Sequence, residues 1–245
     1  MNKSIECGKN EILASVPAAT MARWEPLLTS VDLRLGQVIY EPGDTLEFVY
    51  FPTTALVSLL HVLSDGDMAE IAIVGRDGIV GISLFMGGGS TSTRGVVQSA
   101  GRAMRLPTSA LTREFDLGGP AMHLLLRYTQ ALITQMTQTA ACNRHHAIDQ
   151  QLCRWLLLSI DRLEGNELIM TQELIANMLG VRREGVTVAA GRLQRDGLIR
   201  YSRGRITVVD RDGLERSSCE CYRTVKTEYA RLLAMPMPMP MPVRT

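Results

Sequence analysis

The spacing of hydrophobic and polar residues changes twice along this chain of 245 residues. Short helices, interrupted at Pro17 and Pro26, are predicted before residue 30. From 31 to 106, short runs rich in β-branched and aromatic residues alternate with glycine-containing turns, which predicts strands. The runs are 38–40, 48–51, 55–60, 70–74, 79–82, 96–98 and 103–106. Strands of this number and spacing favour an antiparallel jelly roll.

A helical period replaces the strand pattern over 120–143, where Arg127 is the only charged residue. Leu125, Leu132 and Met136 form one apolar stripe. An adjacent stripe contains Met122, Leu126, Ile133 and Ala140. Because two faces must be buried, we expect one to pack on the chain's own β-roll. The other, with Leu125, Leu132 and Met136, is expected to form a dimer interface; a helix buried entirely within one chain is the alternative.

From residue 168 to residue 209 the pattern is helix, glycine turn, helix and hairpin. Thr171 precedes a helical segment over 172–179, and its hydroxyl can accept a hydrogen bond from a backbone N–H at the helix start. Gly180 ends that segment, because glycine enters the left-handed region without steric cost. A second helix is predicted over 182–196, and the β-prone runs 198–201 and 206–209 predict a hairpin.

This order of elements is that of a winged helix-turn-helix, whose second helix enters the DNA major groove. The candidates for reading base edges are Arg183, Glu184, Thr187 and Val188. The candidates for phosphate contact are Thr171, Gln172, Arg182, Arg192, Arg203 and Arg205. Residues 168–209 hold seven arginines and three acidic residues, a net charge of +4, whereas the whole chain carries +1. Positive charge is therefore concentrated where DNA is expected to lie.

The uninterrupted segment 171–186, TQELIANMLGVRREGV, resembles the DNA-reading unit of the Crp/Fnr family, the cyclic-AMP receptor protein and its relatives. The resemblance implies an α+β chain with an N-terminal antiparallel β-roll (a cyclic-nucleotide-binding-like jelly roll), a long dimerisation helix and a C-terminal winged helix-turn-helix. It also implies a homodimeric transcriptional regulator that binds an inverted repeat in double-stranded DNA. RNA polymerase is the expected further partner if the protein is an activator.

The same resemblance places a possible effector pocket in the segment 81–94. Family members that bind cyclic nucleotides hold the ribose with a glutamate and the cyclic phosphate with an arginine. Ile82 stands where that glutamate belongs, and Arg94 comes late in the count. Because an apolar side chain cannot accept from a ribose hydroxyl, we expect no control by cyclic AMP. The loop Gly87, Gly88 and Gly89 could bind another anion, although a flexible turn is the simpler interpretation.

A metal site is considered because Cys142, His146, Asp149 and Cys153 would share one face of an unbroken helix. A hinge is expected around 145–149, and it would separate them. Cys219 and Cys221 lie two apart in a predicted helix and should point in different directions. We therefore predict no metal and no cofactor. An iron–sulfur centre of the kind held by some relatives is not expected either, because the N-terminal region offers Cys7 alone.

Composition favours a cytoplasmic protein. No apolar run reaches the about 18 residues of a membrane span, and residues 1–6 lack the apolar core of a signal peptide. Five scattered cysteines argue against a disulfide framework. The chain has no nucleophile elbow, no phosphate-binding Gly-Lys-Ser/Thr loop and no metalloprotease histidine pair, so we expect no enzyme.

The predicted domains are a β-roll with N-terminal helices (1–119), a dimerisation helix (120–146), a DNA-binding domain (147–234) and a disordered Met-Pro tail (235–245). The DNA-binding domain should begin with a helix over 150–163 and end with an amphipathic helix over 213–234. The alternative function is a small-molecule or metal/redox sensor with weak or lost DNA binding. Gly185 supports it, because glycine within a helix costs about 1 kcal/mol relative to alanine.

Overall fold

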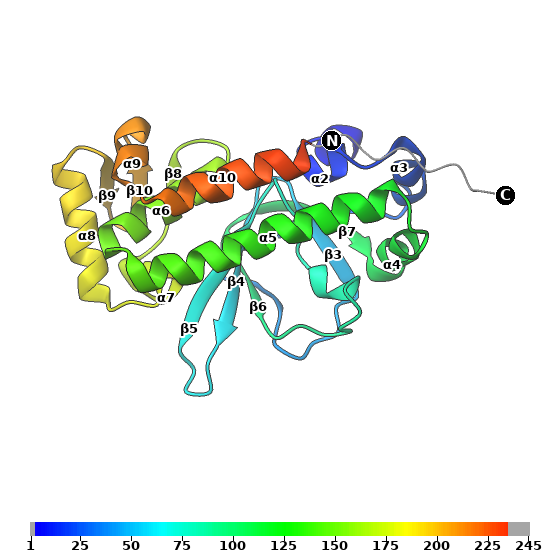
Figure 1. Ribbon diagram of the computed structural model, residues 1–245, viewed down its shortest axis with the longest axis horizontal. Helices are drawn as coiled ribbons and strands as arrows, with labels where there is room; N and C mark the ends of the chain where they lie inside the picture. Colours follow the sequence, from blue (N-terminus) through cyan, green and yellow to red (C-terminus); the bar gives the residue numbers. More distant parts are fainter. Residues whose placement is uncertain (1–2, 235–245) are drawn as a thin grey trace.

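The computed structural model describes residues 3–234 and shows a β-roll and a smaller helical domain connected by one long helix (Figure 1). The Met-Pro tail lies outside the described residues. Three short helices precede the roll: α1 (Lys3–Cys7), α2 (Glu11–Ala14) and α3 (Ala18–Trp24). Asn10 caps α2 and donates to the carbonyls of Pro52 and Gly78, at 2.9 Å each. This buried amide therefore joins the N-terminal helices to the roll.

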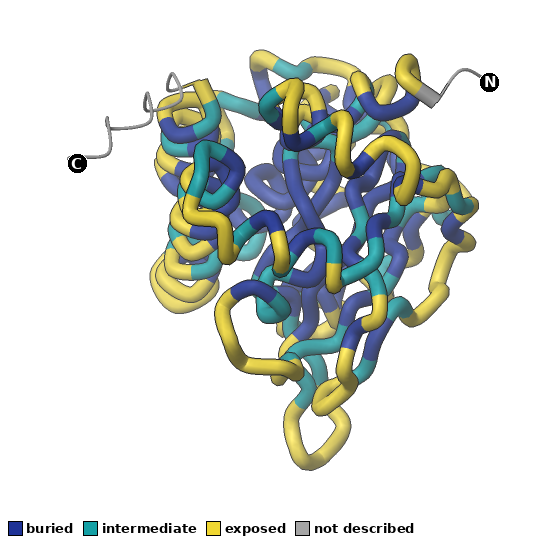
Figure 2. The backbone as a smooth tube through the Cα atoms, turned by 90° about the vertical axis from the view of Figure 1, so that its right-hand side faces the viewer, coloured by how far each residue is buried: buried dark blue, intermediate teal, exposed yellow. Residues whose placement is uncertain are grey.

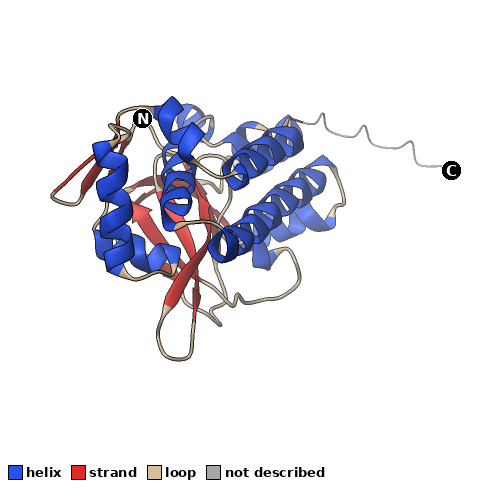
Figure 3. Ribbon diagram, turned by 60° about the vertical axis from the view of Figure 1, so that its left-hand side comes forward, coloured by secondary structure: helices blue, strands red, loops and turns tan. Residues whose placement is uncertain are grey.

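The β-roll consists of two antiparallel sheets, with strand orders β1-β7-β3 and β2-β6-β4-β5. The strands are β1 (Thr29–Leu33), β2 (Val38–Tyr40), β3 (Phe48–Pro52), β4 (Leu56–Val62), β5 (Met68–Val74), β6 (Arg94–Ser99) and β7 (Gly101–Pro107). The β4–β5 hairpin extends from the body of the molecule (Figures 1 and 3) and ends in an exposed loop, while the centre of the roll is buried (Figure 2).

Two parts of the roll differ from the predicted strands. Strand β1 was not predicted. Its sequence, TSVDL, is largely polar, and only Leu33 at its end is buried. The run 79–82 is not a strand: Val80 forms a single bridge with Tyr50, and the 3-10 helix η1 (Ile82–Leu84) follows. Gly81 causes the change of direction, since its φ of 109° is accessible mainly to glycine. The other predicted strands are confirmed within a few residues at each end.

Helix α4 (Thr108–Asp116), which was not predicted, leads into the long helix α5 (Pro120–His145). Strand β5 packs on one side of α5, and the C-terminal helix α10 (Glu220–Leu233) lies along it (Figures 1 and 3). Among the described residues, no helix is both long and apolar enough to cross a membrane.

The prediction that Leu125 and Leu132 form a dimer surface is wrong, because both are buried in the core of their own chain, at 1% and 0% exposure. Met136 is partly buried and packs on the same core. The cover comes from elements of the same chain, including α10, which the apolar stripe alone could not reveal. The large apolar side chains that α5 leaves exposed are Leu126, at 44%, and Ile133, at 49%.

The DNA-binding domain begins with α6 (Ile148–Asp161) and ends with α10. Between them lie β8 (Glu167–Ile169), α7 (Gln172–Leu179), α8 (Arg183–Arg195), β9 (Ile199–Ser202), β10 (Arg205–Val208) and α9 (Arg211–Ser217). The predicted hairpin is confirmed, but β8 adds a third strand in the order β8-β10-β9. The predicted helix over 213–234 is in fact two helices, because Ser218 and Cys219 are extended.

Buried polar contacts attach α6 to the roll. Arg162, which follows α6 and is 3% exposed, donates to the Asp77 carboxylate and to the Gln135 side chain of α5, at 3.0 and 2.8 Å. Charges buried together in this way are costly to separate, because breaking the pair leaves one charge without compensation. The DNA-binding domain is therefore docked on the roll through specific contacts as well as through α5.

Candidate nucleic-acid interface

The first helix of the helix-turn-helix has the predicted bounds and caps. Thr171 is the N-cap of α7, and its side chain accepts a hydrogen bond from the Leu174 N–H at 3.3 Å. Gly180 follows the helix in the left-handed conformation, with φ 64° and ψ 36°. Ile175 and Leu179 are fully or almost fully buried against the rest of the domain. The residues at the two ends of α7 therefore account for where this helix begins and for the turn that leads to the second helix.

Helix α8 presents its first turns to solvent. The base-reading candidates Arg183, Glu184, Thr187 and Val188 are all exposed. Val186 and Ala189 lie on the opposite, buried face, which orients the helix. Arg182 is the N-cap of α8 and makes no side-chain capping bond, because a guanidinium group has no acceptor for a backbone N–H.

The candidate residues of the two helices are connected by one side-chain contact. The Thr187 hydroxyl donates to the Gln172 side-chain oxygen at 2.7 Å and also lies 3.1 Å from the Arg183 carbonyl oxygen. The contact leaves the Gln172 amide NH₂ group as a donor at the start of α7. This contact fixes the start of α7 against the exposed face of α8 and so holds Gln172 and Thr187 in a defined relative position.

The wing completes a cleft of about 440 Å³ between α7, α8 and the β9–β10 turn. The residues lining it are Thr171, Gln172, Glu173, Arg183, Tyr201, Ser202, Arg203 and Gly204. Arg203 and Gly204 form the two-residue turn with φ of 49° and 75°, the signs of a type I′ turn, which suits the twist of a hairpin. The turn therefore holds an exposed arginine at the tip of the wing.

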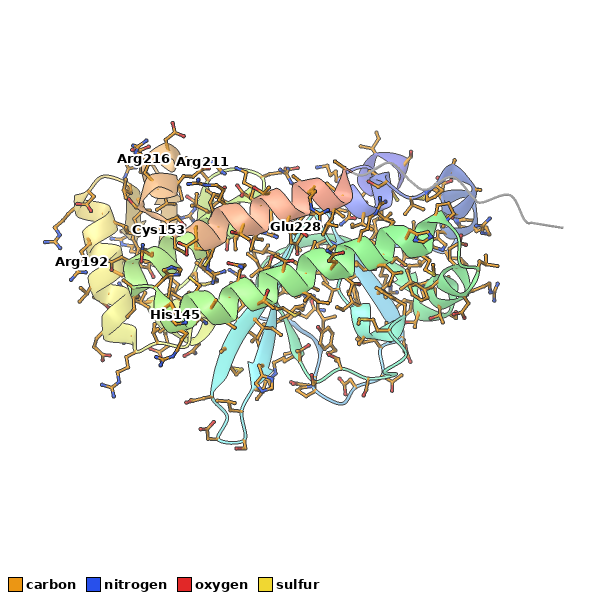
Figure 4. All side chains as sticks on the ribbon, viewed as in Figure 1. His145, Cys153, Arg192, Arg211, Arg216 and Glu228 are labelled. Atoms are coloured by element: carbon orange, nitrogen blue, oxygen red, sulfur yellow. The ribbon has the colours of Figure 1, made fainter. Side chains whose placement is uncertain are left out.

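Three of the candidate arginines have carboxylate neighbours. Arg192 pairs with Asp149 of α6 at 2.9 Å, and Arg205 pairs with Glu167 of β8. Arg183 lies 3.9 Å from Glu173, and both of these side chains are largely exposed. Figure 4 shows Arg192 on α8, at the end of the molecule. A phosphate that binds Arg192 or Arg205 must displace the paired carboxylate. Because exposed ion pairs contribute little individually, this displacement costs little free energy.

Gly185 has a packing role in this structure. A Cβ at this position would lie 2.7 Å from Cδ1 of Ile148, at the start of α6. Helices α6 and α8 therefore approach closely at the glycine. The close approach at Gly185 involves only the terminal methyl group of the Ile148 side chain.

The segment predicted as an effector pocket does not offer the expected polar groups. Ile82 lies in η1 and packs against the hydrophobic core. Arg94 donates to Glu41 at 2.7 Å and lies 3.3 Å from the Met68 sulfur, so its charge is already paired within the roll. Gly87 and Gly89 have positive φ, and the loop 86–90 is exposed. These features are those of an exposed glycine turn.

The predicted break between the long helix and the DNA-binding domain is confirmed. His146 and Ala147 are extended between α5 and α6. The break separates the four candidate ligands of the unbroken-helix hypothesis: Asp149 pairs with Arg192, and Cys153 is buried within α6.

Cys142 and His146 nevertheless lie beside two other cysteines. The potential ligand atoms of Cys142, His146, Cys219 and Cys221 all lie within 4.8 Å of one another. The prediction that Cys219 and Cys221 point in different directions is wrong. Cys219 is the N-cap of α10 with φ −79° and ψ 167°, so helical geometry does not relate it to Cys221. No spacing rule reveals this group, because its halves are more than seventy residues apart in sequence.

An exposed reading helix, a basic wing and a β-roll joined through a long helix define a two-domain transcriptional regulator. The family model for the cyclic nucleotide-binding domain matches residues 30–116, and that for the Crp-like helix-turn-helix domain matches residues 150–217. The chain belongs to the Crp/Fnr family of DNA-binding transcriptional regulators, whose members are not enzymes.

Solved structures of regulators have the same fold. A protein assigned to the Crp/Fnr family from Eubacterium rectale is 18% identical with a TM-score of 0.67, over 88% of this chain and 99% of that one. FixK2 from Bradyrhizobium japonicum is 19% identical with a TM-score of 0.65, over 78% and 98%. A CRP-family transcriptional regulator from Thermus thermophilus is 20% identical with a TM-score of 0.64, over 77% and 96%. No curated protein sequence matches the chain significantly.

Proposed function

We propose that this regulator is a homodimer that recognises an inverted repeat through α8 and is not controlled by cyclic AMP. The observation that carries the proposal is the exposed start of α8 beside the basic cleft of the wing. Buried residues on the other face of α8 fix that orientation.

Arg183 and Glu184 are the principal base-reading residues in this proposal. An arginine matches the paired acceptors of guanine, and a glutamate accepts from the amino group of cytosine. Val188, which is 52% exposed, can contact a thymine methyl group but cannot donate a hydrogen bond. The hydroxyl of Thr187 is directed to Gln172, so its methyl group is the part available to a base. Specificity should therefore reside mainly in Arg183 and Glu184.

Phosphate contacts surround this reading surface. Thr171 and Gln172 at the start of α7, with Arg203 at the wing, line the same cleft. A helix start favours an anion through its exposed N–H groups. Arg182 is exposed beside them, whereas Arg192 and Arg205 can contribute only after competition with Asp149 and Glu167. Arg182 and Arg203, the charged residues that have no carboxylate to displace among the pairs described above, should therefore supply most of the salt-dependent affinity.

Dimerisation is assigned to the face of α5 that its own chain leaves uncovered. Leu126, Ile133 and Ala140 are exposed and seven residues apart, as in one seam of a two-helix coiled coil. The intervening exposed residues Gln130 and Thr137 are polar but uncharged. Two such faces can pack together without burying a charge, and a twofold axis would then place two copies of α8 on one face of DNA.

Selection of bound DNA from a random pool by the purified protein tests this proposal. The expected product is an inverted repeat whose half-sites are about one helical turn, roughly 34 Å, apart. Enrichment of a single asymmetric half-site would contradict the dimer. No enrichment at all would favour the alternative, a sensor whose DNA binding is lost.

A further inference from the structure

Three thiols and one imidazole converge where α5, α6 and α10 meet. The Sγ atoms of Cys142 and Cys219 are 3.5 Å apart, and the Sγ of Cys221 is 3.7 Å from Nδ1 of His146. All four ligand atoms lie within 4.8 Å of one another. Cys142, Cys219 and Cys221 are at most 5% exposed, so the sulfurs face one another away from solvent.

These separations suit a single tetrahedral ion. With zinc–sulfur bonds of about 2.3 Å and zinc–nitrogen bonds of about 2.0–2.1 Å, neighbouring ligands of a tetrahedral zinc ion lie roughly 3.5–3.8 Å apart. Two of the separations already have this value, and since none exceeds 4.8 Å, no pair needs to contract by more than about 1 Å. Three thiolates and one imidazole form a Cys₃His ligand set, which is typical of structural zinc sites. An iron–sulfur cluster is larger and would need its ligands further apart.

The surroundings of the imidazole match a metal-binding histidine. While Nδ1 faces the Cys221 sulfur, Nε2 lies 3.3 Å from a carboxylate oxygen of Glu220. A histidine that binds zinc commonly donates its other ring N–H to a carboxylate, which fixes the ring and its tautomer. Gln151 donates to the carbonyl oxygen of His146 at 2.8 Å, so the backbone at this ligand is also held.

A buried positive charge lies near the sulfurs. Arg154 is 3% exposed, and its guanidinium donates to the Thr139 hydroxyl at 3.2 Å. Its Nε has no hydrogen-bond partner, and it forms no ion pair with a carboxylate among residues 3–234. A zinc ion with three thiolates carries a net charge of about −1, which would compensate Arg154.

We propose that Cys142, His146, Cys219 and Cys221 bind one zinc ion, with Glu220 orienting the histidine. The ligands come from the end of α5, from the α5–α6 junction and from the start of α10. His145 marks this end of α5 in Figure 4. Binding releases thiol protons to solvent and fastens the DNA-binding domain to the long helix across the junction. The ion is therefore structural and fixes the position of the reading helix relative to α5.

Metal analysis of the full-length protein, purified under reducing conditions, tests this site. One zinc ion per chain is expected. After removal of zinc, cobalt(II) should bind with the thiolate charge-transfer bands and intense visible bands of a tetrahedral site. Cys219→Ala and Cys221→Ala should each abolish these bands, whereas Cys7→Ala and Cys153→Ala, which alter buried cysteines outside the group, should retain them.

Glu220→Gln provides a variant that does not depend on the folding of a cysteine mutant. Glu220 is 76% exposed, so the variant should fold, retain the cobalt spectrum and bind zinc about 10–100-fold more weakly. Reduced wild-type protein that binds neither zinc nor cobalt would overturn the proposal. So would loss of cobalt binding in Cys7→Ala as severe as in Cys219→Ala, or a Cys142–Cys219 disulfide in the protein as purified.

Discussion

The indole Nε1 of Trp155 donates a 2.9 Å hydrogen bond to the carboxyl group of Glu70. Trp155 belongs to the first helix of the DNA-binding domain and Glu70 to strand β5 of the roll, so the bond crosses the contact between the two domains. Ser58 donates to the other carboxyl oxygen at 2.6 Å. Burial raises the pKa of Glu70 to about 7. A group that titrates near neutral pH therefore lies at the domain contact.

Stability should fall as pH rises through this range. Below pH 4.5 Glu70 is protonated in both the folded and the unfolded chain, and its contribution to stability is complete. Between that value and about 7, the unfolded chain ionises first, so the free energy of unfolding decreases by about 3 kcal/mol in all. Glu70→Gln keeps a hydrogen-bond acceptor for Trp155 but cannot ionise. The variant should therefore lack this pH-dependent contribution to the free energy of unfolding.

Urea unfolding of both proteins at about pH 5 and about pH 8 measures the effect. The free energy of unfolding of the wild type should fall more between the two values than that of Glu70→Gln. An equal change in the two proteins would show that the folded-state pKa of Glu70 is close to its ordinary value.

The exposed face of α5 gives a second prediction. Leu126→Glu combined with Ile133→Glu should convert the dimer to a monomer, because four charges would meet in an apolar seam. The monomer should remain folded, since Leu126 and Ile133 lie on the surface of a single chain, at 44% and 49% exposure. Sedimentation velocity measures the conversion of dimer to monomer, and circular dichroism shows whether the chain remains folded. Thr112→Glu on α4, away from the seam, is the matched control, and a double mutant that remains a dimer excludes this face.

Cyclic AMP should not bind with useful affinity. Ile82 cannot accept a hydrogen bond from a ribose hydroxyl, and Arg94 must leave Glu41 before it can pair with a cyclic phosphate. Loss of two polar anchors at about 1–3 kcal/mol each is expected to weaken binding by several kcal/mol. Isothermal titration of the purified protein should detect no binding at micromolar concentrations. A micromolar Kd would show that the nucleotide is held by other groups.

The wing arginine should contribute affinity without specificity. Arg203 has a positive φ of 49°, which asparagine tolerates better than most residues, so Arg203→Asn should preserve the turn while removing the charge. Affinity should fall by a similar factor for every DNA sequence, and the slope of log K against log salt should decrease by about one unit. Arg113→Ala on α4 is the control and should alter neither quantity. A sequence-dependent loss in Arg203→Asn would place this arginine on a base.

Local features of the fold were predictable from the sequence, and long-range contacts were not. The bounds of α7, the cap at Thr171 and the left-handed Gly180 follow from neighbouring residues. Leu125 and Leu132 are buried in the core of their own chain, and the elements that pack on α5 include β5 and α10, which are distant from it in sequence. The pairing of β8 with β10 and the contact of Cys219 with Cys142 could not be predicted from the sequence either. Each joins elements that are separate in sequence and come together only in the folded chain.

Arg183 is expected to contact a base rather than a phosphate. The most direct test of this assignment is the affinity of the Arg183→Ala variant for the selected operator and for each single-base variant of it, at several salt concentrations. The expected loss is about 1–3 kcal/mol on the operator, with relaxed preference at one base pair of each half-site and unchanged preference elsewhere. An equal loss of affinity on every sequence would contradict the claim and would make Arg183 a phosphate contact.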